Sequence, residues 1–65
     1  MEKSVQTLLP GAIVQIAAID DIPSHHFEIE EVYDDLVTGI ALTGPLKGEY
    51  GEPPRELILT VISQD

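Results

Sequence analysis

Short apolar runs with a period of two, each ended by proline, glycine or aspartate, recur along this chain and restrict it to a β-sheet fold. Residues 12–19 and 57–62 show this period most clearly, and strands present every second side chain to the same face. An apolar stripe of helical period is missing from the sequence. Four or five short strands separated by turn signals predict an all-β fold, either a small barrel or a rolled sheet of antiparallel strands.

The size and charge of the chain limit its functions. We expect one domain at residues 10–65 after a lead-in at residues 1–9, since 65 residues enclose a single core. The absence of cysteine excludes disulfides and thiolate chemistry and, with no secretory signal at the start, favours a cytoplasmic location. A formal net charge of -9 disfavours direct binding to nucleic acid or anionic membranes. A protein partner is expected instead.

The second predicted strand, residues 26–33, places Phe27 and Ile29 on the core face. Strict alternation would then bury Glu31 and expose Val32, so we predict a β-bulge at Glu30 and Glu31 that returns Val32 to the core. An aspartate pair at residues 34 and 35 then predicts a tight turn.

The third predicted strand covers residues 36–43, with Ile40 and Leu42 as its core pair. Gly39 within it predicts a sharp bend or a close approach of two backbones.

Residues 44–55 form a long irregular segment with three glycines and three prolines, and long loops in small domains are often functional. Tyr50, at its middle, is the best single candidate for contact with a partner, since tyrosine is enriched in binding hot spots. The alternative is that Tyr50 folds back over one open end of the barrel. Lys47, Glu49 and Arg55 complete this candidate surface.

The Pro-Gly-Ala-Ile-Val-Gln-Ile stretch at residues 10–16 resembles the opening strand of small SH3-like barrels, including KOW-type modules and the accessory subunits of photosynthetic electron-transfer complexes. The later order of strand, Asp-Asp turn, strand, Gly/Pro loop and strand is similar across residues 10–62. Residues 44–53 also resemble the signature of a small cyanobacterial-type family. The resemblance implies a fold and no functional residue, and this acidic chain departs from the usually basic KOW-type and ferredoxin-docking barrels.

Seven of the twelve carboxylates lie between Asp20 and Asp35, and Glu28 and Glu30 share the face opposite Phe27 and Ile29. This face is either a solvated surface that keeps the domain soluble or a docking patch for a basic protein. The function expected is a non-catalytic protein-interaction module or accessory subunit of a larger complex. An acidic mimic of DNA that blocks a nucleic-acid-binding protein is an alternative.

The two terminal strands carry apolar residues on both faces. If one face of each fills the core, the other exposes several isoleucines together, which small monomers seldom do. A homodimer or partner contact is therefore expected. Ala18 is expected on the same face of its strand as Val14 and Ile16. The core set is Val14, Ile16, Leu57, Leu59 and Val61, and the self-association set is Ile13, Ile58 and Ile62.

Few residues could carry chemistry. Ser24 beside His25 is no catalytic arrangement, so we expect no enzyme and no cofactor. His25 and His26 could bind a divalent metal weakly, which remains an alternative function. Adjacent histidines on an extended segment point to opposite sides, however, and a solvated loop and strand start is the preferred interpretation.

Overall fold

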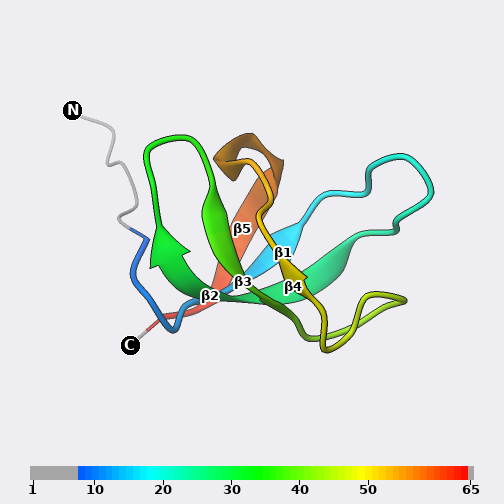
Figure 1. The fold of residues 1–65 in the computed structure, drawn as a ribbon, viewed down its shortest axis with the longest axis horizontal. Helices are drawn as coiled ribbons and strands as arrows, with labels where there is room; N and C mark the ends of the chain where they lie inside the picture. Colours follow the sequence, from blue (N-terminus) through cyan, green and yellow to red (C-terminus); the bar gives the residue numbers. More distant parts are fainter. Residues whose placement is uncertain (1–7, 65) are drawn as a thin grey trace.

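The computed structural model describes residues 8–64 and shows one antiparallel sheet of five strands in the order β4-β3-β2-β1-β5 (Figure 1). A single 3-10 turn, η1 (Arg55–Leu57), precedes the last strand, and no α-helix occurs among these residues. The all-β prediction is confirmed. Most of the predicted lead-in, residues 1–7, lies outside the described residues. The strands are β1 (Ile13–Ile16), β2 (His25–Val32), β3 (Val37–Ala41), β4 (Tyr50–Gly51) and β5 (Ile58–Ser63).

The predicted bulge in β2 is present. Ile29 pairs with Gly39 and Glu31 with Thr38, so Glu30 has no partner of its own on β3. This extra residue restores the alternation, and Val32 packs half-buried against the core. The chain then turns at residues 34 and 35, as predicted.

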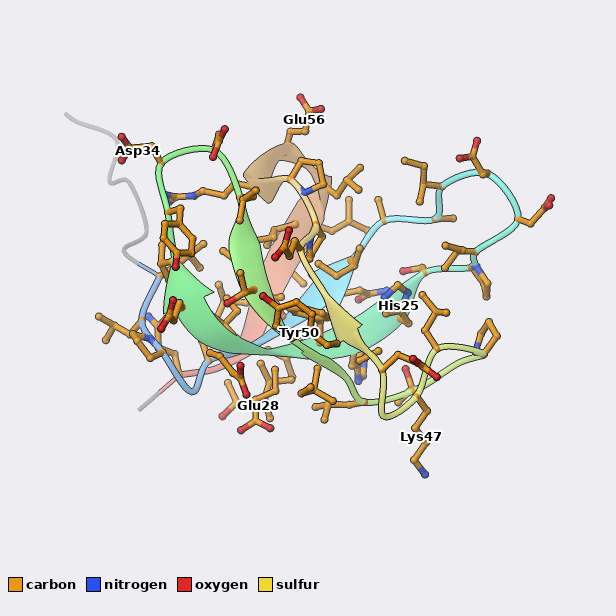
Figure 2. All side chains as sticks on the ribbon, viewed as in Figure 1. His25, Glu28, Asp34, Lys47, Tyr50 and Glu56 are labelled. Carbon is orange, nitrogen blue, oxygen red and sulfur yellow. The ribbon has the colours of Figure 1, made fainter. Side chains whose placement is uncertain are left out.

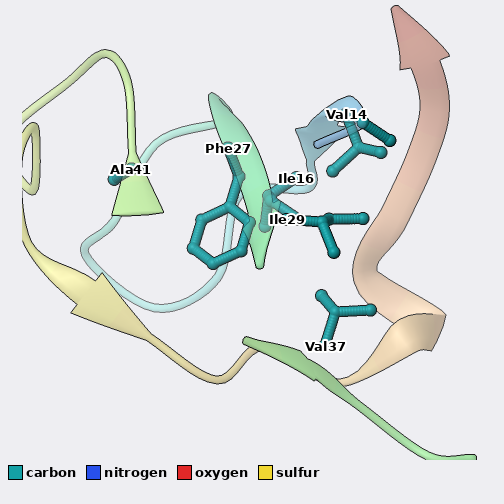
Figure 3. Packing of buried hydrophobic residues seen from close by; sticks show 7 residues of the cluster. Val14, Ile16, Phe27, Ile29, Val37 and Ala41 are labelled. Atoms are coloured by element: carbon teal, nitrogen blue, oxygen red, sulfur yellow. The ribbon is translucent and has the colours of Figure 1, made fainter. Parts of the chain in front are cut away.

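The core lies inside the curve of the sheet and is built entirely from residues 12–41 (Figure 3). Its members alternate along β1 and β2, which is the period expected of strands with one buried face. Three half-buried residues from the C-terminal part of the chain pack against this core: Leu57, Ile58 and Val61. The fully packed set is Ala12, Val14, Ile16, Phe27, Ile29, Val37 and Ala41.

The prediction for the third strand was wrong about its core pair. Ile40 and Leu42 are only half-buried, whereas Val37 and Ala41 face the core. The reason is Gly39: a Cβ there would overlap the Glu28 carbonyl oxygen and approach Phe27 Cε2 to 2.9 Å. The inner face of β3 therefore carries small residues where the Phe27 ring packs, and its larger apolar residues lie on the other face.

On the last strand, Leu57 and Val61 pack against the core as predicted, but two assignments of faces were wrong. Leu59, predicted in the core, is 60% exposed, while Ile58, predicted outside, packs against the core. The pairing with β1 shifts twice, and the two residues skipped are Leu59 and Ile62. Two bulges thus expose these side chains and bring Ile58 and Val61, three positions apart, to the same face.

The first strand ends earlier than predicted, so Ala18 is exposed rather than buried. Ile19 and Ile22 then pair across a tight turn, with backbone hydrogen bonds of 2.9 and 2.8 Å between them. Asp20 in this turn has φ +52, a conformation that aspartate tolerates better than most residues. Within residues 8–64, no helix is long and apolar enough to cross a membrane.

Candidate functional site

Residues 44–57, which we call the returning segment, leave β3 and come back along its far edge as β4 (Figures 1 and 2). Gly44 and Gly48 have φ of +81 and +86, which L-residues rarely adopt, so both turns depend on glycine. The Gly48 N–H donates to the Ala41 carbonyl oxygen at 2.8 Å and closes the loop. In this position the returning segment lies opposite the turn between Ile19 and Ile22.

A groove of about 290 Å³ lies between that turn and the returning segment, and we call it the apolar groove. Phe27 and Ala41 line its inner side and belong to the core. Glu49 and Glu52 add two carboxylates to the lining. The groove therefore offers a mostly apolar surface with negative charge beside it. Its other apolar side chains include Ile16, Ile19, Ile22, Leu46, Pro53 and Leu57.

A second, more open hollow of about 320 Å³ lies on the other side of Tyr50, and we call it the tyrosine pocket. Tyr50 and Glu52 line both hollows and therefore stand between them. No basic side chain among residues 8–64 lines the tyrosine pocket. It is formed by Tyr33, Asp35, Leu36, Thr38, Tyr50 and Glu52.

Tyr50 is 57% exposed and lies near the middle of the view in Figure 2. Its hydroxyl donates to Glu52 Oε2 at 3.0 Å. This hydrogen bond is the main cause that raises the pKa of the phenol above its ordinary value, with smaller contributions from desolvation and the Glu52 charge. The ring is therefore fixed at its polar end and open at its sides, which suits a contact residue better than a buried cover over the core.

Tyr33 is a site residue that the sequence analysis did not single out. Its hydroxyl donates to Glu31 Oε1, and this hydrogen bond, followed by the charge of the same carboxylate, raises the pKa of the phenol. Tyr50 adds to the upward shift, which places the two phenols in one electrostatic environment. The spacing of two between Glu31 and Tyr33 is compatible with side chains on one face of a strand, but it does not indicate that Tyr33 lies beside Tyr50.

His25 lies at a strand start as predicted, but the expectation that it is solvated was wrong. It is only 8% exposed at the start of β2, and its Nδ1 lies 2.8 Å from the Pro23 carbonyl oxygen, so Nδ1 carries the proton and donates. His26 is half-buried on the opposite side of the strand, as adjacent residues require. Within the described part of the chain, no three histidine or carboxylate side chains converge on a metal position.

The other residues predicted to bind a partner are scattered. Glu49 lines the apolar groove, whereas Lys47 sits at the tip of the turn and points away from Tyr50 (Figure 2). The Arg55 guanidinium donates to the Tyr33 carbonyl oxygen at 3.2 Å and thereby ties the returning segment to the end of β2. Glu28 and Glu30 are exposed on β2 and line neither groove nor pocket.

The residues predicted for self-association do not form one exposed set. Ile58 packs against the core and Ile13 is half-buried, so only Ile62 is exposed as expected. Leu59 takes the place that Ile58 was predicted to have. The exposed apolar pair on β5 is therefore Leu59 and Ile62.

The comparisons with known proteins add no relative from which a role could be transferred. The chain matches no family model, no curated protein and no solved structure.

Proposed function

We propose that this chain is a non-catalytic protein-interaction module, SH3-like in fold, that binds a basic and partly apolar segment of a partner protein through the apolar groove. The observation that carries the proposal is an open apolar groove, lined by two carboxylates and an exposed tyrosine, on a chain of net charge -9. The sequence order that resembles SH3-like barrels supports the same module class.

The groove supplies the apolar part of recognition. Leu46 is 37% exposed at the groove, and its burial by a partner would remove apolar area from water, the main favourable term in association. Tyr50 adds a large ring with few rotatable bonds, which loses little conformational entropy on binding. Both side chains come from the returning segment, so one stretch of sequence would provide most of the contact.

Charge would select the partner and speed the encounter. Glu49 and Glu52 line the groove, and Glu28 and Glu30 lie exposed on the neighbouring strand β2. Complementary charge chiefly raises the rate of association and excludes acidic competitors.

A display library of random-sequence peptides, selected against the full chain, tests the apolar part of the proposal. We expect enriched peptides that combine a large apolar residue with lysine or arginine. Leu46→Ser should weaken their binding about tenfold, whereas Leu59→Ser, the same change at a leucine that lines neither hollow, should leave it unchanged. Failure to enrich any peptide, or equal loss in both variants, would overturn the groove as the binding site.

Reversing Glu28 and Glu30 to lysine tests the electrostatic part. The association rate of a selected basic peptide should fall, and its dependence on salt should become flatter, because steering depends on unscreened charge. Stopped-flow measurement at low salt gives the rate constant directly. An unchanged rate constant would show that the charges of these two residues do not steer the partner's approach.

A further inference from the structure

The tyrosine pocket has a composition that the apolar groove lacks. Two exposed aromatic rings, Tyr33 and Tyr50, line a single open hollow together with the carboxylates of Asp35 and Glu52. An apolar ligand would gain less here than in the groove, since this hollow is more open and fewer apolar side chains line it. Aromatic faces beside carboxylates are the surroundings in which a cationic group is best stabilised.

Hydrogen bonds at their hydroxyl ends hold the two rings in place before any ligand arrives. Tyr33 donates to Glu31 and Tyr50 donates to Glu52. These bonds restrict both side chains, so a ligand that stacks on them would lose less affinity to side-chain ordering. The acceptor carboxylates also add negative charge at the edge of each ring.

Arg55 does not line the tyrosine pocket. Its guanidinium donates to the backbone carbonyl of Tyr33 and lines an adjoining hollow, which shares Asp35 and Leu36 with the pocket. The tyrosine pocket therefore combines negative charge and aromatic faces with no positive side chain in its lining among residues 8–64.

We propose that the tyrosine pocket receives an arginine side chain of the partner segment, an inference that rests on the proposed function. A planar guanidinium can stack on a tyrosine ring and at the same time donate to carboxylates through its edge. Lysine is more strongly hydrated and lacks the planar fork, so it fits the same groups less well. Because Tyr50 and Glu52 border both hollows, the partner's arginine would lie next to the apolar residue of the partner that occupies the groove.

The test uses N-acetyl-arginine amide as a probe that is too small to need the groove, with the citrulline and lysine analogues as matched ligands. Amide chemical shifts of the full chain report both the site and the affinity. We expect shifts concentrated at Tyr33, Thr38, Tyr50 and Glu52, with arginine binding about tenfold more tightly than its uncharged isostere citrulline and more tightly than lysine.

Three variants assign the effect to the pocket. Tyr33→Leu should weaken arginine binding about fivefold, and Tyr33→Phe, which keeps the ring, should bind almost as the parent chain does. Leu46→Ser should have no effect on the probe. Equal affinity for arginine and citrulline, shifts located elsewhere, or no loss in Tyr33→Leu would each overturn the inference.

The outcomes separate this inference from the proposed function. Peptides that need Leu46 but show no preference for arginine would leave the groove as a binding site and remove the arginine pocket. If the probe binds at Tyr33 while no peptide depends on Leu46, the arginine pocket would be retained and the groove would be removed as a binding site.

Discussion

The sheet half of the molecule, residues 12–41, and the returning segment, residues 44–57, have nearly opposite properties. All seven packed core residues belong to the first, and none belongs to the second. The returning segment instead contributes Leu46, Glu49, Tyr50 and Glu52 to the two hollows. The packed core thus comes from one stretch of sequence, whereas the two hollows combine side chains of both stretches. Substitutions of the exposed side chains that the returning segment contributes should therefore affect binding more than stability.

Glycines show the difference most directly. Gly39 in β3 is required by packing, because the Glu28 carbonyl and the Phe27 ring fill the space beside it. Gly48 in the returning segment has open space around it and is required only by its φ of +86. Glycine is therefore required by tertiary packing in residues 12–41 and by local backbone conformation in the returning segment.

The largest effect is expected from Gly39→Ala. The added methyl group would overlap a backbone oxygen and press on a core ring, neither of which can move without separating β2 from β3. The cost should exceed about 4 kcal/mol, which is comparable with the total stability of about 3–10 kcal/mol expected for a domain of this size. Urea unfolding followed by circular dichroism should show a midpoint shifted to much lower urea, or no cooperative transition at all. A normal curve would contradict the close approach.

Ile29→Ala and Leu46→Ala compare the two halves with similar deletions. Ile29 is fully packed, so its loss should lower the free energy of unfolding by about 2–5 kcal/mol. Leu46 is partly exposed at the groove, and its loss should lower it by less than about 1 kcal/mol. Denaturant midpoints at constant m-value measure both. Similar losses in the two variants would mean that the returning segment is part of the core.

Gly48→Ala should have an intermediate to small effect. No heavy atom is within contact distance of the new methyl group, so the whole cost is that of the left-handed backbone, about 1–2 kcal/mol. Gly48→Asn should cost less, because asparagine visits this conformation more readily. Equal losses in the two variants, measured by thermal unfolding, would point to a steric cause instead.

The exposed pair on β5 is expected to have almost no effect on stability. Leu59→Ser with Ile62→Ser should change the free energy of unfolding by less than about 0.5 kcal/mol per site, since both side chains are largely in water. If this pair forms the homodimer contact that the sequence predicts for the terminal strands, light scattering should show a dimer for the parent chain and a monomer for the double variant. A parent chain that stays at 7.1 kDa at high concentration would exclude the dimer.

Sequence reasoning succeeded where a local pattern determines the structure. The bulge at Glu30 followed from Val32 being out of phase, and the close approach followed from a glycine inside a strand. It failed on β5, where alternation alone assigned Leu59 to the core. The two bulges there depend on how β5 pairs with β1, and that register is a tertiary property which no local pattern contains.

The candidate site was predicted in part. Tyr50 and Glu49 were identified because a Gly/Pro-rich segment must leave its side chains near the surface. Tyr33 was missed because it lies 17 positions away in sequence, and only the turn of the sheet brings it to the same hollow as Tyr50. The burial of His25 was missed for a related reason, since it depends on distant parts of the chain such as Gly44, where an added Cβ would lie 3.4 Å from His25 Cβ.

The smallest effect on stability is expected from ionisation of the phenol groups of Tyr33 and Tyr50. Both tyrosine pKa values are raised above the ordinary value of 10.0, so the folded chain holds these protons to higher pH than the unfolded chain does. The free energy of unfolding should therefore be unaffected below about pH 10 and should fall as pH rises through the window between the unfolded and folded pKa values.

Spectrophotometric titration of tyrosinate should show Glu31→Gln lowering the Tyr33 pKa, because both the charge and the charged acceptor are lost. Glu28→Gln is the matched control, since Glu28 contributes to neither shift. Equal titration curves for the two variants would mean that Glu31 does not hold the Tyr33 ring. The statement that Tyr33 is held in place in the tyrosine pocket before a ligand binds would then be wrong.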